Sequence, residues 1–454
     1  MTGTMTGNMT GYDLLVVGGG PAGVAGALTA ARAGLRVALL DAGPRLGGQY
    51  FRHLPGATDG KLHHGLDRFL RQSDALHASA DVLLGHRVWT ITRDPAGFTV
   101  QALAGEREEE PVALRGAAVL IATGAHDRPL PFPGWDLPGV LTPGGAQALL
   151  KGHGVAAGRR VVVAGTGPFL LPVAAGLARA GVKVAAVLEA SGGLGLARHP
   201  VLAAAKAGEA AGYAATLVRH RVPYRTRSAV VRAHGDDEVT HVTVARLDRD
   251  WRVRSTETVE CDTVAVGYGF LPQIELATQL GCASANDADG SPILTVDQEQ
   301  RTSVPGVYAA GEPAGVGGAA LAEIEGRIAG HAVAGLAVPE HLLLRRTRLR
   351  SFARALQEAY PVRPGWQDWL AADTLVCRCE EVPLSAVREA QELGATDARS
   401  IKLLARPGMG WCQGRMCGYA VSCLAGEAPQ APRRPVAQPI TLGSLERISD
   451  DQPR

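Results

Sequence analysis

The stretch Asp13-Leu-Leu-Val-Val-Gly18-Gly-Gly20-Pro-Ala-Gly23, close to the amino terminus, carries the clearest signal of the fold class. A short apolar run leads into a glycine turn, and an alanine- and leucine-rich stretch of helical character follows as far as Ala33-Gly34. The next apolar run, Val37–Asp41, ends on an acid. Because glycine commonly stops a helix and β-branched runs favour strands, this order predicts a β-strand, an α-helix and a parallel β-strand.

A second unit of the same kind begins at Arg160. Its sequence Arg160-Val-Val-Val-Ala-Gly165-Thr-Gly167-Pro-Phe-Leu170 again joins an apolar run to a glycine turn, and a helical stretch then ends at Ala180-Gly181. The strand-like run after it closes on Glu189. Two βαβ units in one chain predict an α/β fold with two Rossmann-like dinucleotide-binding domains.

The composition is that of a globular protein with an excess of glycine. The chain has 454 residues, of which 57 are glycine and 46% are hydrophobic, and its formal net charge is +2. Glycine usually makes up about 7% of a protein, but the excess has no G-X-Y period, so the chain is not collagen-like. The hydrophobic content excludes a disordered chain. Without a dense basic stripe, no nucleic-acid partner is predicted.

The amino terminus carries no export or membrane signal. Residues 1–11 are rich in Met, Thr and Gly and lack a charged segment followed by an apolar one, so we predict a disordered lead-in. The apolar runs 14–31 and 161–178 have the length of membrane helices, but glycine and proline interrupt both at turn positions. We therefore predict no transmembrane segment and a cytoplasmic location.

The first glycine turn has the G-x-G-x-x-G spacing of a dinucleotide site. Gly18 permits the tight turn, Gly20 lets the backbone approach a pyrophosphate, and Gly23 lets the helix pack against the strand. The amino end of the helix then faces the phosphates, and Asp41 is placed to accept a hydrogen bond from a ribose hydroxyl.

The second glycine turn departs from this spacing. Gly165 and Gly167 are present, but Leu170 stands where the third glycine belongs. A leucine there is expected to push the helix off the strand and to move its dipole relative to a pyrophosphate. Glu189 favours an unphosphorylated ribose, which leaves NAD or an adenine nucleotide as candidates and makes NADPH a poor one. The alternative is that this domain is a packing scaffold without a nicotinamide.

Further segments carry a resemblance to a known family. They are Gly47-Gly48-Gln49 after the first acid, Val119–Gly124, Cys261–Gly267 and Ser303–Glu312. Together with the two glycine turns they resemble, over residues 12 to 335, the two-dinucleotide flavoproteins that include glutathione and thioredoxin reductases. The resemblance implies FAD held by Gly18, Gly20, Pro21, Ala22, Gly23, Asp41, Gly48, Gln49, Thr123, Gly124, Gly311 and Glu312. Most of the family has aspartate where Glu312 stands.

The disulfide chemistry of that family is not expected here. Its disulfide reductases carry a redox-active cysteine pair beside the flavin, whereas the stretch 47–70 contains no cysteine. Cys261 and Cys282 are too far apart in the sequence to form such a pair. Without an attacking thiolate next to a resolving thiol, disulfide reduction is excluded.

Four of the seven cysteines form two close pairs near the carboxyl terminus. Cys377-Arg-Cys379 opens this segment and Cys412-Gln-Gly-Arg-Met-Cys417 closes it, with a helix–loop–helix pattern between them. Four thiolates in two pairs suit a zinc ion or an iron–sulfur cluster, although zinc sites more often use C-x2-4-C spacing. Cys423 lies outside the pattern and is expected to be a small buried residue.

The segment Gly408-Met-Gly-Trp-Cys-Gln-Gly-Arg-Met-Cys417 resembles the bacterioferritin-associated ferredoxin type of 2Fe–2S domain. The match is closest to the version in flavoprotein subunits of hydrogen cyanide synthase, opine oxidase and amine dehydrogenases. It implies a cluster on Cys377, Cys379, Cys412 and Cys417, with Trp411 shielding it. It also implies a partner subunit of the amino-acid-oxidase type that holds its own FAD, and a small ferredoxin-like subunit. Zinc, or no metal, stays the alternative.

These features predict the following organisation. After the lead-in come a discontinuous FAD-binding domain at 12–139 and 269–338, an NAD-binding-like domain at 140–268, a linker at 339–370, a small helical 2Fe–2S domain at 371–425 and a tail at 426–454. The tail is rich in Pro, Gln and Arg and is expected to wrap a neighbouring surface or to stay mobile.

The sequence contains no persuasive catalytic constellation, so no catalytic residue is predicted. His126 is more simply a turn residue than a catalyst, and His53, His63 and His64 have no acid or metal partner in the pattern. FAD and a 2Fe–2S cluster without a substrate site describe an electron conduit. We therefore expect the electron-transferring subunit of a heteromeric dehydrogenase or oxidase for an amino acid, imino acid or opine. The alternatives are a stand-alone NADH-dependent FAD oxidoreductase and a nucleotide-binding scaffold subunit.

Overall fold

The first glycine turn lies at the centre of a mixed sheet in the computed structural model, which describes all residues except 1–10, 57–62, 64, 106–108, 193–199 and 451–454. The predicted lead-in and His64 therefore fall outside the described residues. The strand order is β3-β2-β1-β6-β5-β4, and β19 pairs with β6. Strands β1 (Tyr12–Val17), β2 (Val37–Asp41), β3 (Asp81–Leu84), β6 (Glu110–Ile121) and β19 (Val307–Ala309) run parallel, while β4 (His86–Asp94) and β5 (Gly97–Ala104) form antiparallel pairs.

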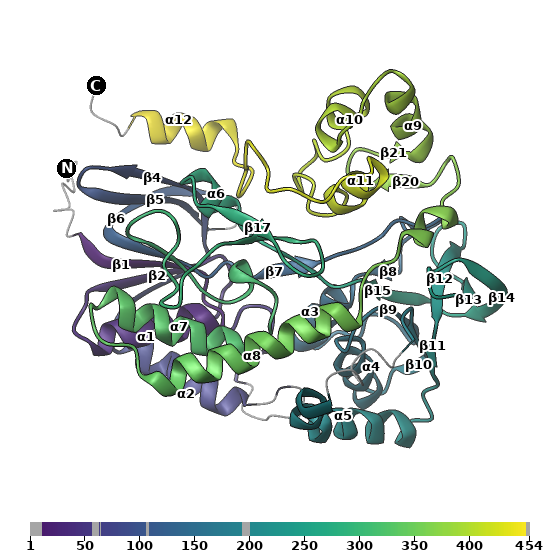
Figure 1. The fold of residues 1–454 in the computed structure, drawn as a ribbon, viewed down its shortest axis with the longest axis horizontal. Coiled ribbons are helices and arrows are strands. Elements are labelled where there is room, and N and C mark those ends of the chain that lie inside the picture. Colours follow the sequence, from purple (N-terminus) through teal and green to yellow (C-terminus); the bar gives the residue numbers. More distant parts are fainter. Residues whose placement is uncertain (1–10, 57–62, 64, 106–108, 193–199, 451–454) are drawn as a thin grey trace, which may run out of the picture.

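Helices α1 (Pro21–Arg32) and α7 (Ala319–Val333) cover one face of this sheet and cross each other at glycines (Figure 1). A Cβ atom on Gly326 would lie 2.0 Å from the carbonyl oxygen of Ala22, and one on Gly330 would lie 2.6 Å from that of Gly26. The two helices can therefore approach this closely only because these positions lack side chains. Part of the glycine excess serves this crossing. On the same face, α2 (Leu66–His77) packs beside α1.

We expect Gly326→Ala to destabilise the protein by about 1–3 kcal/mol, the usual cost of overpacking a filled core. Urea unfolding followed by circular dichroism measures this change. Gly212→Ala is the matched control, since Gly212 is exposed within helix α5 (Pro200–Arg219) and a Cβ there would meet no atom within 4 Å. The control should be neutral or slightly stabilising. Equal effects of the two substitutions would show that the helix crossing does not depend on Gly326.

The second glycine turn belongs to a separate parallel sheet. Its strand order is β11-β10-β9-β15-β8. The strands are β8 (Val140–Leu141), β9 (Arg160–Gly165), β10 (Lys183–Glu189), β11 (Tyr224–Thr226) and β15 (Thr263–Gly267). One face packs against α3 (Pro143–His153) and α4 (Leu170–Arg179), and the other against the antiparallel sheet of β12 (Ser228–His234), β13 (His241–Leu247) and β14 (Val253–Glu260). Alternate residues of β9 enter the two cores, which explains its unbroken apolar sequence.

Short elements connect the two domains and complete the first one. Strand β7 (Ala125–Asp127) pairs with β16 (Phe270–Pro272), so the chain leaving the first sheet and the chain returning to it run side by side. The remaining elements of the returning segment are α6 (Glu275–Gln279), the hairpin of β17 (Ser284–Asn286) and β18 (Pro292–Leu294), and the short helix η2 (Glu312–Ala314).

The segment 339–370, predicted as a linker, is mostly helical. It contains α8 (Glu340–Ala359), which lies along α7, and the short helix η3 (Pro364–Trp369). Arg346 and Arg350 of α8 form ion pairs with Glu325 of α7, whose side chain is fully buried. By its composition, this arginine-rich segment looks like a solvated connector. In the structure, however, Arg346 and Arg350 neutralise the buried charge of Glu325, and an unpaired buried charge would destabilise the fold.

The cysteine module, residues 371–425, docks on the rest of the molecule through a shared apolar core. Its elements are β20 (Leu375–Cys377), β21 (Val382–Pro383), α9 (Leu384–Glu392), α10 (Ala398–Ala405) and α11 (Gly418–Leu424). Tyr419 and Ala420 of α11 join the buried cluster that contains Trp135 of the first domain and Trp251 of the second. Trp135 also donates a hydrogen bond from Nε1 to the carbonyl of Leu375, at 2.6 Å. The module is packed in place and is not a tethered, free domain.

The tail returns across the first domain. Asn286 donates to the carbonyl of Pro429, and the side chain of Ala437 is buried in the core under β4 and β5. Helix α12 (Leu442–Asp450) then lies above β4 in Figure 1, where Ser444 donates to the carboxylate of Glu109 at 2.9 Å. Of the two behaviours expected for the tail, the structure has it wrapped on a neighbouring surface.

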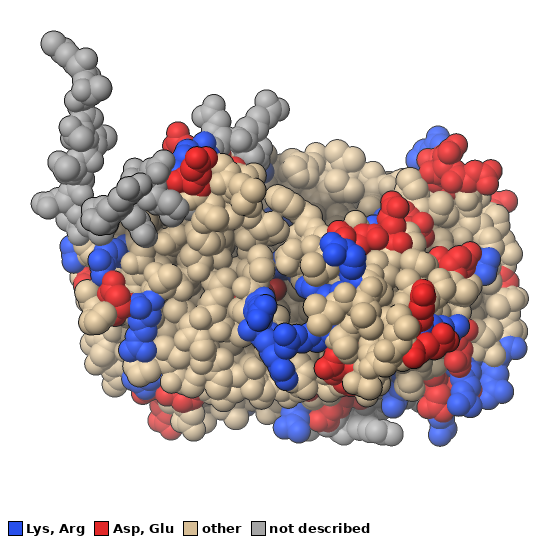
Figure 2. All heavy atoms as spheres, turned by 90° about the horizontal axis from the view of Figure 1, so that it is seen from above, with Lys and Arg blue, Asp and Glu red and all other residues tan. Residues whose placement is uncertain are grey.

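The surface and the helices give two further facts. The face seen in Figure 2 carries basic and acidic side chains of both signs around broad uncharged areas, without an extended basic stripe. Among the described residues, no helix is both long and apolar enough to cross a membrane.

Candidate functional site

The glycines of the first turn differ in their surroundings: Gly18 and Gly23 are closely packed against backbone atoms, whereas Gly20 faces open space. Gly18 has φ +107°, and a Cβ there would lie 2.3 Å from the carbonyl oxygen of Ala122; one on Gly23 would lie 1.8 Å from that of Gly18. A Cβ on Gly20 would meet only Cα of Gly48, at 3.9 Å. The backbone at Gly20 therefore borders free space at the start of α1, which begins at Pro21 and Ala22, as a backbone that receives a pyrophosphate must.

Asp41 holds this turn together from the end of β2. Its carboxylate accepts hydrogen bonds from the backbone N–H of Gly19 and of Gly43, both at 2.6 Å. Burial raises the pKa of Asp41, and the two amide donors partly offset that effect. Each carboxylate oxygen has more than one acceptor site, so the group can also accept from a ribose hydroxyl.

The loop after β2 lies over the glycine turn. The N–H of Gly47 donates to the carbonyl of Gly19 at 2.8 Å, and a Cβ on Gly48 would lie 3.1 Å from Cα of Gly20. The side chain of Gln49 accepts from Arg52 at 3.0 Å. The loop thus forms a second wall beside Gly20.

Two other predicted residues lie where β6 ends. Thr123 donates from Oγ1 to the carbonyl of Gln273 at 2.6 Å, and the N–H of Gln273 donates to the carbonyl of Gly124 at 2.9 Å. These bonds tie the end of β6 to the segment that returns from the second domain. A Cβ on Gly124 would meet nothing within 4 Å, so its backbone is also open.

Gly311 and Glu312 precede α7. The N–H of Gly311 donates to buried Glu325 at 3.0 Å, while the carboxylate of Glu312 accepts from the backbone N–H of Gly317 at 3.1 Å and of Gly318 at 3.0 Å. Glu312 thereby holds the residues that lead into the helix. Burial raises its pKa to about 7.

This raised pKa predicts a pH dependence of stability in the flavin-free protein. The folded state keeps a proton on Glu312 up to about pH 7, whereas an unfolded glutamate loses it near pH 4.5. Between these pH values the folded state binds more protons, so its stability falls as pH rises. Glu312→Gln should remove this part of the slope in unfolding curves recorded from pH 4.5 to 8. An unchanged slope would show that Glu312 does not titrate in this range.

The second glycine turn has a retracted helix start. Helix α1 begins directly after Gly20, but α4 begins only at Leu170, three positions after Gly167. Leu170 and Leu171 instead make tight-turn bonds to the carbonyls of Gly167 and Pro168, at 3.3 and 3.2 Å. The side chain of Leu170 is 1% exposed and fills the core beneath α4. The sequence predicts a helix pushed off the strand; the change that the structure shows is a later helix start along the chain.

Glu189, the acid of this second site, is fully buried and already has several donors. It accepts from Oγ1 of Thr166 at 2.7 Å, from the N–H of Gly167 at 2.8 Å and from the N–H of Ser191 at 2.8 Å. Burial raises its pKa. A Cβ on Gly165 would lie 1.7 Å from the carbonyl of Gly267, so this glycine serves close strand packing. Compared with Asp41, Glu189 has less remaining capacity for a ribose.

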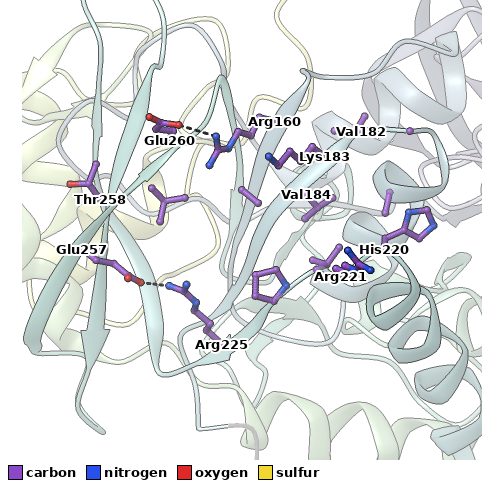
Figure 3. A pocket seen from close by; sticks show the side chains of 16 residues that line it. Arg160, Val182, Lys183, Val184, His220, Arg221, Arg225, Glu257, Thr258 and Glu260 are labelled. Atoms are coloured by element: carbon purple, nitrogen blue, oxygen red, sulfur yellow. Dashed lines mark hydrogen bonds and ion pairs between the residues drawn. The ribbon is translucent and has the colours of Figure 1, made fainter.

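A cavity of about 840 Å³ lies at the opposite end of the second sheet (Figure 3). Arg160 and Lys183, the first residues of β9 and β10, line it together with Glu257 and Glu260 of β14. Arg160 pairs with Glu260 at 2.9 Å across the cavity. Gly165 and Glu189 are at the carboxyl ends of the same strands, where dinucleotides bind in such sheets. The cavity is therefore separate from the predicted nucleotide site.

The four cysteines of the module meet as two pairs. The sulfur atoms of Cys379 and Cys412 are 3.5 Å apart, and Cys417 is hydrogen-bonded to Cys377. The hydrogen bond from Cys417 is the largest effect that lowers the pKa of Cys377, to about 5, and the N–H of Gly408 also donates to its sulfur. The same interaction and burial raise the pKa of Cys417.

The loops carrying these pairs are built for close approach. Gly408 has φ +74°, and a Cβ on Gly410 would lie 2.7 Å from Cβ of Cys379. Within the part of the chain that the structure describes, no three or more His, Cys, Asp or Glu side chains surround one point in the manner of a mononuclear metal site. The donors are two thiol pairs instead. Trp411 was expected to shield this site, but its side chain is 67% exposed.

The remaining cysteines do not form a redox pair. Cys261 is buried in the core of the second domain and Cys282 in that of the first, and all seven cysteines are free thiols. Burial raises the pKa of Cys261 to about 11. Cys423 is half-buried beside the module's docking core. The predicted absence of a flavin-side dithiol agrees with these positions.

The histidines have structural contacts. His53 and His63 bond to the carbonyls of Phe51 and Arg52. Nε2 of His126 lies 3.2 Å from the carbonyl of Arg415 in the cysteine module, and burial lowers the pKa of His126 to about 4. His126 therefore joins two domains and does not cap a local turn.

Several charged residues that join distant segments of the chain around the site were not predicted from the sequence. Arg128 pairs with Asp289 at 2.9 Å in the interior and lies over the ring of Tyr419, 4.7 Å from its centre. Lys151 faces the ring of Tyr50 at 5.9 Å, and burial lowers the pKa of Lys151 to about 8. No sequence motif marks these residues, because their partners are distant in the chain.

Comparison with known proteins identifies the family. The family model described as pyridine nucleotide-disulphide oxidoreductase matches residues 12–350. The chain belongs to this family. Hydrogen cyanide synthase subunit HcnB of Pseudomonas aeruginosa is 36% identical over 96% of this chain and 99% of its own length. An opine oxidase subunit of Agrobacterium tumefaciens is 33% identical over 96% of this chain and 92% of its own length.

Solved structures agree on the fold. L-proline dehydrogenase from P. horikoshii has a TM-score of 0.69 at 21% identity, covering 96% of this chain and 79% of that one. Thioredoxin reductase from T. acidophilum has a TM-score of 0.54 at 24% identity, covering 71% of this chain and 98% of that one. The predicted α/β flavoprotein fold of the glutathione- and thioredoxin-reductase type is therefore confirmed. The match to L-proline dehydrogenase covers nearly the whole of this chain.

Proposed function

We propose that this protein is the electron-transferring FAD and 2Fe–2S subunit of a heteromeric dehydrogenase or oxidase. Its complex would oxidise a C–N bond of an amino acid, imino acid or opine in a partner flavin subunit. The observation that carries the proposal is the pairing of Cys377 with Cys417 and of Cys379 with Cys412 in a module packed against both domains. The cytoplasm, as predicted, remains the proposed location.

The thiol arrangement supports a dinuclear cluster over zinc. A structural zinc ion takes four donors around one point, whereas a 2Fe–2S cluster takes two thiolates on each of two irons. The two pairs match the second requirement. The N–H of Gly408 beside the sulfur of Cys377 also favours the thiolate form, which a metal ligand needs. A bound cluster would accept and give electrons singly.

The first glycine turn supports FAD. Gly20 borders free space at the amino end of α1, Gly48 forms the opposite wall, and Asp41 retains acceptor sites for a ribose. We propose that these residues bind the pyrophosphate and the adenosine ribose, and that Gly124 and Gly311 border the rest of the flavin. The protein's part is to bind, orient and exclude water, while the flavin supplies the redox chemistry.

The names of the relatives support a complex. HcnB is named as a subunit of hydrogen cyanide synthase and the second relative as one of opine oxidase, and both align with this chain over at least nine-tenths of their length. We propose a partner of the amino-acid-oxidase type with its own FAD, and a small ferredoxin-like subunit. Co-expression of this chain with such neighbours tests the proposal: amine-dependent reduction of the flavins only in the assembled complex supports it, and flavins that stay oxidised contradict it.

The second domain makes a direct NADH reaction unfavourable. Relative to Gly167, helix α4 starts two residues later than α1 does relative to Gly20, and Glu189 already accepts three hydrogen bonds. We expect that mixing the FAD-loaded protein with NADH under anaerobic conditions leaves the flavin absorbance near 450 nm unchanged. Rapid bleaching would instead support the alternative of a stand-alone NADH-dependent oxidoreductase.

A further inference from the structure

Arg415 lies between Cys412 and Cys417 and attaches their loop to the first domain. Its guanidinium pairs with Glu275 of α6 at 3.2 Å, and the two side chains are 17% and 16% exposed. It also donates to the carbonyl of Ala437 in the returning tail, at 2.5 Å, and to the carbonyl of Cys412, at 3.4 Å. One side chain thus connects the cysteine loop to α6 and to the tail.

The backbone of Arg415 makes a further connection. Its carbonyl lies 3.2 Å from Nε2 of His126 on β7. Because a carbonyl can only accept, Nε2 must carry the proton, and Nδ1 is then a buried acceptor without a partner among the described residues. His126 comes two residues after Gly124, and Arg415 two residues before Cys417. One hydrogen bond therefore joins the proposed flavin-binding loop to the cysteine loop.

We propose that Arg415 and His126 are positioning residues that hold the cysteine loop against the flavin-binding loop and provide a bonded route between the two redox centres. This inference rests on the function proposed above. Electron tunnelling weakens less steeply through bonds than across gaps, so a hydrogen bond at this point favours transfer. With both groups bound, the reduced flavin would lose one electron at a time and the oxidised cluster would gain it. No covalent bond forms or breaks, and neither side chain is itself oxidised.

The rest of the module's docking is independent of these residues. Tyr419 lies under Arg128 and within the shared core, and Trp135 bonds to the carbonyl of Leu375. Loss of the Arg415 contacts should therefore loosen the loop without releasing the module. This separation makes the role testable in a folded protein.

The first arm of the test measures loop opening by amide hydrogen exchange in the full cofactor-loaded chain. Glu275→Gln removes the charge that Arg415 pairs with, so exchange over residues 412–418 should quicken by about two- to fivefold. Glu389→Gln is the matched control, since Glu389 is an exposed residue of α9 in the same module. Unchanged exchange in Glu275→Gln would overturn the positioning role.

The second arm follows electron transfer. After anaerobic photoreduction of the flavin, the appearance of the reduced cluster is recorded by absorbance and by electron paramagnetic resonance. His126→Leu, which has no donor, should slow this step several-fold, and His126→Gln, which retains one, should restore most of the rate at equal iron, sulfide and flavin content. Equal rates in all three proteins would overturn the route. A wild-type protein without a cluster would overturn the proposed function, while the exchange arm would still decide whether Arg415 positions the loop.

Discussion

Replacing Cys412 with alanine is expected to remove iron and acid-labile sulfide from the protein while the FAD content stays unchanged. The substitution leaves Cys379 without its partner at 3.5 Å, and it would leave one iron of the proposed cluster with a single thiolate. The first glycine turn belongs to another domain and shares no residue with this site. Iron, sulfide and flavin assays of the purified variant measure the result.

Cys423→Ala is the matched control for this experiment. Cys423 belongs to the same module but lies outside the two pairs, and its thiol is half-buried. Its removal should leave iron and sulfide unchanged. Retention of the cluster in Cys412→Ala, or its loss in Cys423→Ala, would show that the ligands have been assigned wrongly. Loss of FAD together with iron in Cys412→Ala would show that the two sites depend on each other.

The second large effect is expected for Gly20→Val, which should strongly weaken FAD binding in a folded protein. Gly20 has φ −78°, an ordinary value for any residue, and a Cβ there meets only Gly48, at 3.9 Å. The side chain would fill the space that the proposed pyrophosphate needs. At a cost of about 3 kcal/mol for the crowding, the Kd for FAD should rise about 100-fold. Flavin content and FAD titration by fluorescence measure this change.

Two comparisons make the result specific to the ligand. The circular dichroism spectrum of Gly20→Val should match that of the wild type, because a Cβ at this position meets only Gly48, at 3.9 Å. Gly212→Val, in exposed α5, should bind FAD normally. A Gly20→Val protein with wild-type FAD affinity would contradict the assignment of this turn as the flavin site.

The parts of the fold and site that could be predicted from the sequence are those coded by local spacing. Gly18, Gly20 and Gly23 lie within six residues of one another. Their spacing reflects three local requirements: a tight turn, a backbone that a pyrophosphate can approach, and close packing of the helix on the strand. The two cysteine pairs are likewise each local, at C-x-C and C-x4-C. Physical constraints that act within one turn or loop leave a regular pattern in the sequence, and these patterns are sufficient for the fold class.

The contacts that join the domains could not be predicted in the same way. Arg350 and Glu325 are 25 residues apart, Arg415 and Glu275 are 140 apart, and His126 and Arg415 are 289 apart. An arginine that pairs with a buried acid looks in the sequence like any solvated arginine. For this reason the composition of segment 339–370 predicts a linker where the structure has helices. Pairings across such distances are decided by the folded arrangement of the domains.

Leu170 is intermediate between the local patterns and the long-range contacts. The missing glycine is visible in the sequence and indicates an altered turn, but its effect depends on where the leucine side chain goes. In the structure it enters the core beneath α4, and the helix starts two residues later than in the first unit. The sequence locates the defect, and the packing determines its form.

Electron paramagnetic resonance of the dithionite-reduced full chain at low temperature tests most directly whether the two cysteine pairs hold a 2Fe–2S cluster beside an FAD site. We expect the spin-one-half signal of a reduced 2Fe–2S cluster, with an intensity that scales with iron and sulfide content. The signal should be absent from Cys412→Ala. A reduced protein that has no such signal and contains zinc in place of iron would show that the chain is not the proposed electron-transferring subunit.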